Sequence, residues 1–183
     1  ELMTPELERE VSVGEGGGPL FRSALKKLGA DGWIGISWPK EYGGQGRSTI
    51  EQYLFADEAQ RAGFPFPFLT ISTVGPTIQQ YGSDEQKHRY LPKLVSGEHV
   101  GALAMSEPGS GSDVVSMRTR ATRCPGGWTL DGNKMWITNG PDADTLVVYA
   151  KSDPDAGARG ITAFLIEKGM KGFSTAQKLD KLG

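Results

Sequence analysis

The sequence is poor in the residues that build disulfides, metal centres and histidine-dependent active sites. Its 183 residues include a single cysteine, Cys124, and only two histidines, His88 and His99. One cysteine cannot form an intrachain disulfide or a cysteine-rich metal site, and two histidines are too few for a histidine-rich one. We therefore expect no bound metal, and we interpret Cys124, which precedes a Pro-Gly-Gly turn, as a thiol without a chemical role.

Two further absences exclude whole classes of protein. Lys and Arg number 20 against 22 Asp and Glu, a net charge of −2, whereas a dedicated nucleic-acid-binding protein would carry a basic excess. No apolar run approaches the ~20 residues that a membrane-spanning helix requires. Residues 1–9 do not combine a basic stretch with an apolar one, so we expect no secretory signal peptide there.

The first half of the chain has helical patterns. Capping boxes at Ser48 and Ser83 open two helices, because in each the first side chain and the one three residues later satisfy free backbone amides. Pro76, within an otherwise helical stretch, predicts a kink or a boundary near the glycine before it. We expect an all-α domain over residues 1–97. An earlier helix is predicted from four apolar residues that share one face: Phe21, Ala24, Leu25 and Leu28.

From residue 98 onward, short β-rich runs alternate with turn residues. This pattern predicts an antiparallel barrel or sandwich over residues 98–183. The expected fold class is therefore α+β, an all-α domain followed by a β domain. The predicted strands cover residues 100–103, 117–123, 134–138, 145–151, 160–167 and 173–178.

A glycine–serine loop over residues 107–113 follows the first of these strands. Gly109 and Gly111 allow the backbone to turn tightly and to approach a ligand with no Cβ in the way. The loop serines and the exposed amides can then donate to phosphate oxygens, as in an anion-binding nest. Taken alone, an ordinary β-turn explains the loop better, and the loop is neither a Walker loop nor a Rossmann fingerprint.

A second segment, around Trp136 and Thr138, offers a flat ring and a hydroxyl. On a strand these two side chains face the same side, where the indole can lie against a planar ring and the hydroxyl can bond a ring heteroatom. Core packing with a surface threonine explains this segment better when it is taken alone. A phosphate loop and this pair together are what a flavin nucleotide needs.

Taken together, the motifs resemble those of the acyl-CoA dehydrogenase family, over almost the whole chain from about residue 28 onward. Residues 134–183 look most like the isovaleryl-CoA dehydrogenase branch, and the first hundred residues look more like actinobacterial members. Four segments carry the resemblance, in the order and spacing of the family: Trp38–Gly46, Tyr81–Pro92, Met105–Asp113 and Lys134–Gly140.

The resemblance implies FAD in a groove between the β domain and a C-terminal four-helix domain that follows the present chain. Ser106, where the family often has threonine, and Thr138 would bond the isoalloxazine ring, and Gly111 would meet the pyrophosphate. Ser112 and Arg159 would contact the acyl-CoA. The residues expected to bind FAD are Leu103, Ala104, Met105, Ser106, Gly109, Gly111, Ser112, Trp136, Ile137 and Thr138.

The reaction implied by the resemblance is α,β-dehydrogenation of a short or branched acyl-CoA, with hydride transfer to the flavin and onward transfer to an electron-transfer flavoprotein. The family's catalytic glutamate would lie beyond Gly183, and Glu107 belongs to the FAD loop, so no catalytic base is assigned to this chain. We expect the chain alone to bind FAD weakly and to turn over no acyl-CoA. The family suggests a homo- or hetero-tetramer at full length.

Two other interpretations stay open at this point. One is an acyl-CoA oxidase or a related flavoprotein of the same fold, which would differ in its electron acceptor. The other is a non-catalytic subunit that binds FAD or acyl-CoA and pairs with a complete partner. In each case we expect a cytoplasmic protein, or a protein of the mitochondrial matrix if the source is eukaryotic.

Overall fold

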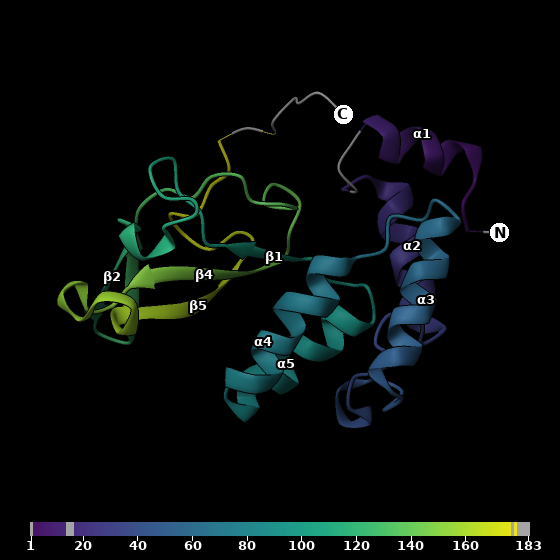
Figure 1. Ribbon diagram of the computed structural model, residues 1–183, viewed down its shortest axis with the longest axis horizontal. Coiled ribbons are helices and arrows are strands. Elements are labelled where there is room, and N and C mark those ends of the chain that lie inside the picture. Colours follow the sequence, from purple (N-terminus) through teal and green to yellow (C-terminus); the bar gives the residue numbers. More distant parts are fainter. Residues whose placement is uncertain (1, 14–16, 177, 179–183) are drawn as a thin grey trace. The chain divides into compact units, whose positions relative to one another are not determined.

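The structure is a computed structural model that describes residues 2–13, 17–176 and 178 (Figure 1). Contacts between residues divide the chain into two units. The helical unit comprises residues 1–101 together with Asp142–Asp144, and the sheet unit comprises residues 102–141 and 145–183. Within the described ranges, no helix combines the length and the apolar character needed to cross a bilayer.

The helical unit confirms the helices predicted from local patterns. The predicted apolar face is buried, and both capping boxes form, with Glu51 and Gln86 reaching back to the serine amides. A boundary does fall at Gly75, where a π-helical turn passes into the next helix. The elements are α1 (Pro5–Val13), α2 (Pro19–Ala30), η1 (Lys40–Tyr42), α3 (Thr49–Arg61), η2 (Thr70–Val74), α4 (Gly75–Tyr81) and α5 (Asp84–Val95).

The short segment Asp142–Asp144 belongs to the helical unit because it is bonded to it on several sides. The Arg22 guanidinium of α2 pairs with the Asp144 carboxylate and donates to the Asp142 carbonyl. The backbone N–H of Val100 donates to the same carboxylate at 2.9 Å, and the amide of Asp144 donates to the Val100 carbonyl at 2.9 Å. The residues just before the longest buried strand are therefore anchored in the helical unit.

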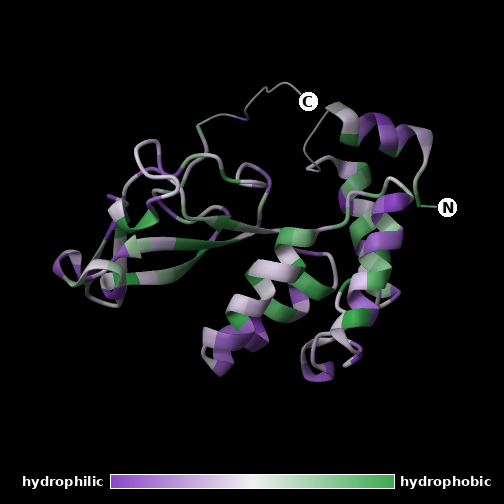
Figure 2. Cartoon of the chain, in the orientation of Figure 1, coloured by the Kyte–Doolittle hydropathy of each residue, from purple (hydrophilic) through white to green (hydrophobic). Residues whose placement is uncertain are grey.

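The sheet unit is built on a five-stranded sheet in the order β1-β4-β2-β3, with β5 paired to β4. β4 and β5 form an antiparallel ladder from Thr145–Glu167 to Lys151–Ile161, and Figure 2 shows them as mostly hydrophobic. β4 is almost entirely buried, so it forms the centre of this core. The elements are β1 (Gly101–Ala104), η3 (Val114–Ser116), β2 (Arg120–Cys124), β3 (Gly127–Asp131), β4 (Thr145–Lys151), η4 (Pro154–Gly160) and β5 (Ile161–Glu167).

Two predicted strands are wrong. Residues 134–138 form a loop, because Trp136 has a φ of 62°, in the left-handed region that ends an extended run. Residues 173–176 are also irregular, since two turns with left-handed glycines, Gly169 and Gly172, precede them. Gln177, in the same predicted strand, lies outside the described residues.

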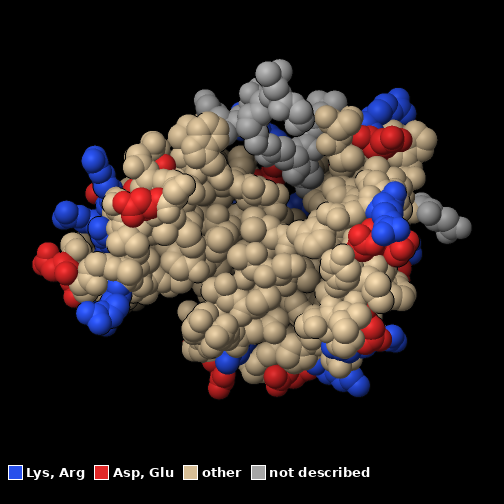
Figure 3. All heavy atoms as spheres, viewed as in Figure 1, with Lys and Arg blue, Asp and Glu red and all other residues tan. Residues whose placement is uncertain are grey.

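Two further expectations about the strands need correction. The run predicted from residue 117 enters the sheet only at Arg120, because the three residues before it turn around a buried carboxylate, and β3 was not predicted. The sheet is also not wholly antiparallel: β2 meets β4 in parallel, through the pair of Arg120 with Lys151. The α+β fold class, with a helical part followed by a sheet-containing part, is confirmed. On the face shown in Figure 3, positive and negative side chains lie near one another.

Candidate functional site

The glycine–serine loop begins with a tight reversal directly after β1. The amide of Glu107 donates to the Ser110 carbonyl at 2.9 Å, and the amide of Ser110 donates back at 3.1 Å. Pro108 and Gly109 therefore stand at the tip of a two-residue turn. The Ser110 hydroxyl is buried and donates to the Asp113 carbonyl at 2.5 Å. The loop is thus an ordered turn held by its own bonds, with its tip exposed to solvent.

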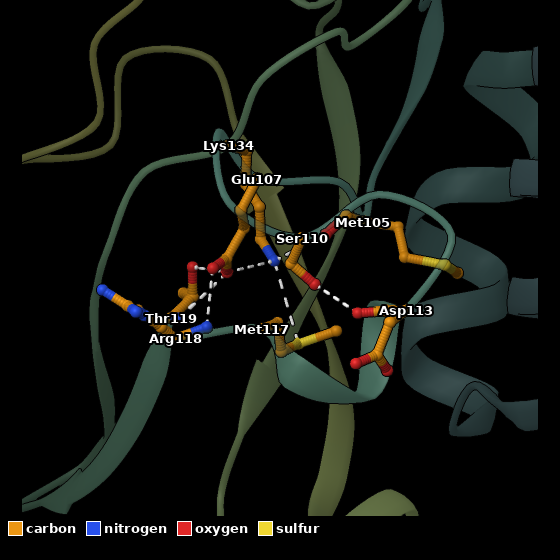
Figure 4. Close-up of polar contacts among 8 residues, drawn as sticks. All are labelled: Met105, Glu107, Ser110, Asp113, Met117, Arg118, Thr119 and Lys134. Atoms are coloured by element: carbon orange, nitrogen blue, oxygen red, sulfur yellow. Dashed lines mark hydrogen bonds and ion pairs between the residues drawn. The ribbon is translucent and has the colours of Figure 1, made fainter.

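The side chain of Glu107 points inward and gathers donors from two other segments (Figure 4). Its carboxylate accepts from the amide of Arg118 at 2.6 Å and from the amide of Thr119 at 2.9 Å. The Thr119 hydroxyl and the Lys134 ammonium, the latter at 3.0 Å, complete the set. With 6% of its side chain exposed, this carboxylate is held entirely by the protein.

The pKa of Glu107 reflects two opposing effects. Burial alone would raise this pKa, since it penalises the charged form. The donors from Arg118, Thr119 and Lys134 outweigh burial and lower the pKa to about 2. Glu107 therefore stays ionised at neutral pH, and its lone pairs are occupied by donors. A carboxylate in this state is a structural anion, and it is unsuited to act as a general base.

Lys134 links the loop to the second predicted segment. Its ammonium donates to the Met105 carbonyl at 2.9 Å as well as to Glu107, and it lies 3.8 Å from the Met117 sulfur. Next to it, the amide of Met135 donates to the Ser106 carbonyl at 3.0 Å. The structure thus brings together the loop after β1 and the residues around Trp136, as the flavin interpretation requires.

The conformation of Trp136 is strained, and the neighbouring bonds compensate for it. A non-glycine residue in the left-handed region costs on the order of 1–3 kcal/mol, and Trp136 has a φ of 62° with 61% of the residue exposed. A neutral hydrogen bond such as that of Met135 contributes about 1 kcal/mol net, whereas a bond to a charged group contributes about 1.5–3 kcal/mol. The charged contacts of Lys134 therefore cover the range of this strain, whereas the Met135 bond matches only its lower end.

The exposure of the indole is compatible with a planar ligand, although not by the geometry expected from the sequence. Trp136 and Thr138 do not share the face of a strand, because the segment is a loop. Thr138 is exposed, and Ile137 between them is half-buried. The ring and the hydroxyl therefore lie in one short loop, and both residues are exposed.

Open space surrounds two glycines of the first loop. Gly109 and Gly111 do not have left-handed backbones, and a Cβ placed on either would meet no atom within 4 Å. Neither the backbone conformation nor the packing of this chain therefore requires glycine at these positions. The remaining reason for glycine at these two positions is the close approach of a ligand, and a bulky phosphate-bearing group is such a ligand.

The other predicted site residues lie in different settings. Leu103 and Ala104 belong to β1, and Ser112 is exposed on the loop. Arg159 is exposed in η4 and, among the described residues, makes no hydrogen bond or ion pair with either loop. Lys134 was missed as a functional residue. Glu107 could have pointed to Lys134, because a carboxylate that is buried within a glycine–serine loop needs hydrogen-bond donors.

Comparisons with known proteins place this site in a family. Residues 4–98 match the model of the acyl-CoA dehydrogenase N-terminal domain, and residues 102–183 match that of the acyl-CoA dehydrogenase middle domain. The chain therefore belongs to the acyl-CoA dehydrogenase family, which confirms the resemblance noted in the sequence.

Individual relatives agree with this assignment. The mitochondrial isovaleryl-CoA dehydrogenase of Solanum tuberosum is 56% identical over 162 residues, which cover 86% of this chain and 39% of that protein. The ChsE4–ChsE5 complex from Mycobacterium tuberculosis has a TM-score of 0.84 at 42% identity, covering 94% of this chain and 44% of that chain. PigA with FAD and proline has a TM-score of 0.85 at 30% identity, covering 98% and 47%. The chain spans less than half the length of each of these three proteins.

Proposed function

We propose that the protein is an FAD-dependent dehydrogenase of short or branched acyl-CoA thioesters, and that this chain supplies the helical and sheet parts of it. Family membership and the 56% identity to an isovaleryl-CoA dehydrogenase support the reaction and the substrate class. The observation that carries the proposal is structural: a loop with two sterically open glycines is tied by Lys134 to a loop that exposes Trp136 and carries Thr138.

The residues around these two loops suit a dinucleotide that carries both a flat ring and phosphates. The indole of Trp136 offers an apolar face, and the hydroxyls of Ser106 and Thr138 are suited to bond ring heteroatoms. Backbone amides at Gly111 and Ser112 are suited to donate to a pyrophosphate. Bound FAD supplies the acceptor for the hydride that leaves the substrate. The proposed contacts are Leu103, Ala104, Met105, Ser106, Gly109, Gly111, Ser112, Trp136, Ile137 and Thr138.

The acyl-CoA is proposed to meet this chain at Ser112 and Arg159. The Ser112 hydroxyl is exposed beside the open glycine of the loop, and Arg159 presents an exposed guanidinium from η4. A guanidinium is a suitable partner for the phosphate groups of coenzyme A. These two residues would bind and orient the substrate, and neither would transfer a proton.

We assign no catalytic base to these residues. Glu107 is excluded on physical grounds, because four donors outweigh the effect of burial and hold it ionised with a pKa of about 2. In the family pattern, the glutamate that removes the α-proton would lie beyond Gly183. We therefore expect these residues alone to bind FAD weakly and to show no dehydrogenation of isovaleryl-CoA.

The acceptor, assembly and location follow as parts of the same proposal. Electrons would pass from the flavin to an electron-transfer flavoprotein, and the full-length protein would be a homo- or hetero-tetramer. Reduction of such an acceptor, rather than of oxygen, would separate a dehydrogenase from an acyl-CoA oxidase. We propose a cytoplasmic location, or the mitochondrial matrix if the source is eukaryotic; the relative in Solanum tuberosum is a mitochondrial protein.

One observation favours a second candidate, an FAD- or acyl-CoA-binding subunit that works with a different chain. The M. tuberculosis structure that this chain resembles at 42% identity is a complex of two components, ChsE4 and ChsE5. If the same arrangement applies to this protein, the chain would bind FAD and gain activity only when its partner is added.

A titration with FAD tests the proposed site. Flavin fluorescence should be quenched on addition of the wild-type chain, and Gly111→Ala should weaken this binding by about 10-fold, or about 1.4 kcal/mol, because the new methyl group occupies the space of the ligand. Gly127→Ala is the matched control, since its Cβ also meets open space and its backbone is not left-handed. Equal FAD affinity for both variants would contradict the proposed site.

A further inference from the structure

Lys134 is an unusual lysine for a site that is proposed to bind a phosphate-bearing ligand. A lysine beside an anion-binding loop commonly points its charge at the anion. In this chain 11% of the Lys134 side chain is exposed, and the ammonium points inward to the Met105 carbonyl and the Glu107 carboxylate (Figure 4). Lysines are almost never this buried unless they are paired.

The charges of this pair cancel, so neither member is available to a ligand. The ammonium of Lys134 lies 3.0 Å from the Glu107 carboxylate, and that carboxylate also accepts hydrogen bonds from the amides of Arg118 and Thr119. The cluster therefore adds no net charge to the proposed site. Its effect on a ligand has to come through the backbone segments that it joins.

Those segments are the two that carry the proposed flavin contacts. Lys134 fixes the Met105 carbonyl on one side, and on the other it stands two residues before the strained Trp136. The bond from the amide of Met135 to the Ser106 carbonyl lies between these points. Bonds to a charged group contribute more than a neutral bond, so the contacts of Lys134 contribute more than the Met135 bond to holding the left-handed backbone of Trp136.

We infer that Lys134 and Glu107 are positioning residues: the buried pair holds Trp136 in its left-handed, exposed conformation and fixes it relative to the loop of Ser106 and Gly111. The pair acts through the backbone and touches neither cofactor nor substrate. The effect on flavin binding rests on the proposed function, whereas the coupling of the two loops does not.

Amide hydrogen exchange in the full chain tests the coupling without any ligand. In Lys134→Met, the amide of Met135 should exchange about 10-fold faster, a shift that corresponds to losing about 1.4 kcal/mol of local stability, while the amide of Leu28 in α2 keeps its wild-type rate. Lys134→Arg, which keeps the charge, should restore protection. Lys27→Met, which breaks an exposed ion pair with Asp31 at 3.3 Å, is the matched control and should change neither amide.

The flavin readout then separates this inference from the proposed function. With FAD bound, Lys134→Met should weaken affinity by about 10-fold and change the visible circular dichroism of the flavin, and Lys134→Arg should restore both.

Unchanged exchange at Met135 would overturn the inference. Faster exchange with unchanged affinity and spectrum would overturn its functional part. A wild-type chain that binds no FAD would refute the proposed function, yet the exchange result would still decide the coupling. If Lys134→Met does not fold, Lys134→Gln, which keeps a donor, takes its place with the same expectations.

Discussion

The buried carboxylate of Glu107 makes a specific prediction about the pH dependence of stability. Its pKa falls from the ordinary value of 4.5 to about 2 in the folded chain. A group whose folded pKa is lowered contributes stability that is fully present above its unfolded pKa and is lost as the pH falls toward the folded value. Glu107 should therefore stabilise the fold above about pH 5 and cease to do so between about pH 5 and about pH 2.

The magnitude follows from the same two values. A decrease from 4.5 to about 2 corresponds to about 3 kcal/mol, of which about 2 kcal/mol is lost between about pH 7 and about pH 3. Glu107→Gln cannot titrate, so this component should disappear. The variant should also be less stable at about pH 7 by about 2–4 kcal/mol, because it leaves the Lys134 ammonium buried without a counter-charge.

Urea unfolding followed by tryptophan fluorescence measures both effects at about pH 7 and about pH 3. Glu6→Gln is the control, because it removes a carboxylate whose side chain is 63% exposed in α1. The control should lose as much stability on acidification as the wild-type chain, and Glu107→Gln should lose about 2 kcal/mol less. If all three chains lost equal stability, Glu107 would not be held ionised by its donors, and it would no longer be excluded as a base.

Three further changes test the helical unit, each by the midpoint of thermal or urea unfolding. Ser48→Ala should lower the free energy of unfolding by about 1 kcal/mol, because it removes the N-cap of α3. An unchanged free energy would contradict the capping box. Arg22→Met should lower the free energy of unfolding by about 1–3 kcal/mol, since it leaves the Asp144 carboxylate with one donor fewer. An unchanged midpoint would show that the ion pair is not formed. Gly75→Ala should cost about 1–3 kcal/mol because its Cβ would overlap the ring of Trp38, and a neutral result would mean that the helix is not packed this closely.

Patterns that depend on neighbouring residues predicted much of the fold. The apolar face of α2 and the capping boxes at Ser48 and Ser83 formed as expected, because helix spacing and N-cap bonds are local. β4 was predicted with its correct bounds, and β5 to within one residue, since both are apolar runs between turns. The strand at residues 134–138 was predicted on the same grounds, and the structure has a loop there.

The failure at Trp136 has a tertiary cause. Tryptophan, isoleucine and threonine all favour strands, so nothing in the local composition suggests a left-handed residue among them. The bonds that hold this conformation come from residues about 27–29 positions earlier in the chain, through Lys134 to Met105 and Glu107. A conformation that is maintained by distant charged contacts against local preference cannot be found by a search for periodicity.

The pairing itself could have been inferred in part from the chemistry of Glu107. A carboxylate in a tight turn after a buried strand must find donors or stay in solvent. The nearest cations in the sequence are Arg118 and Arg120, yet the structure uses the backbone amide of Arg118 and leaves both of these residues exposed. The cation that pairs with Glu107 is Lys134, whose ammonium reaches the carboxylate and the Met105 carbonyl together. Choosing between these cations requires knowing that the two loops are adjacent, and that is what the sequence pattern does not contain.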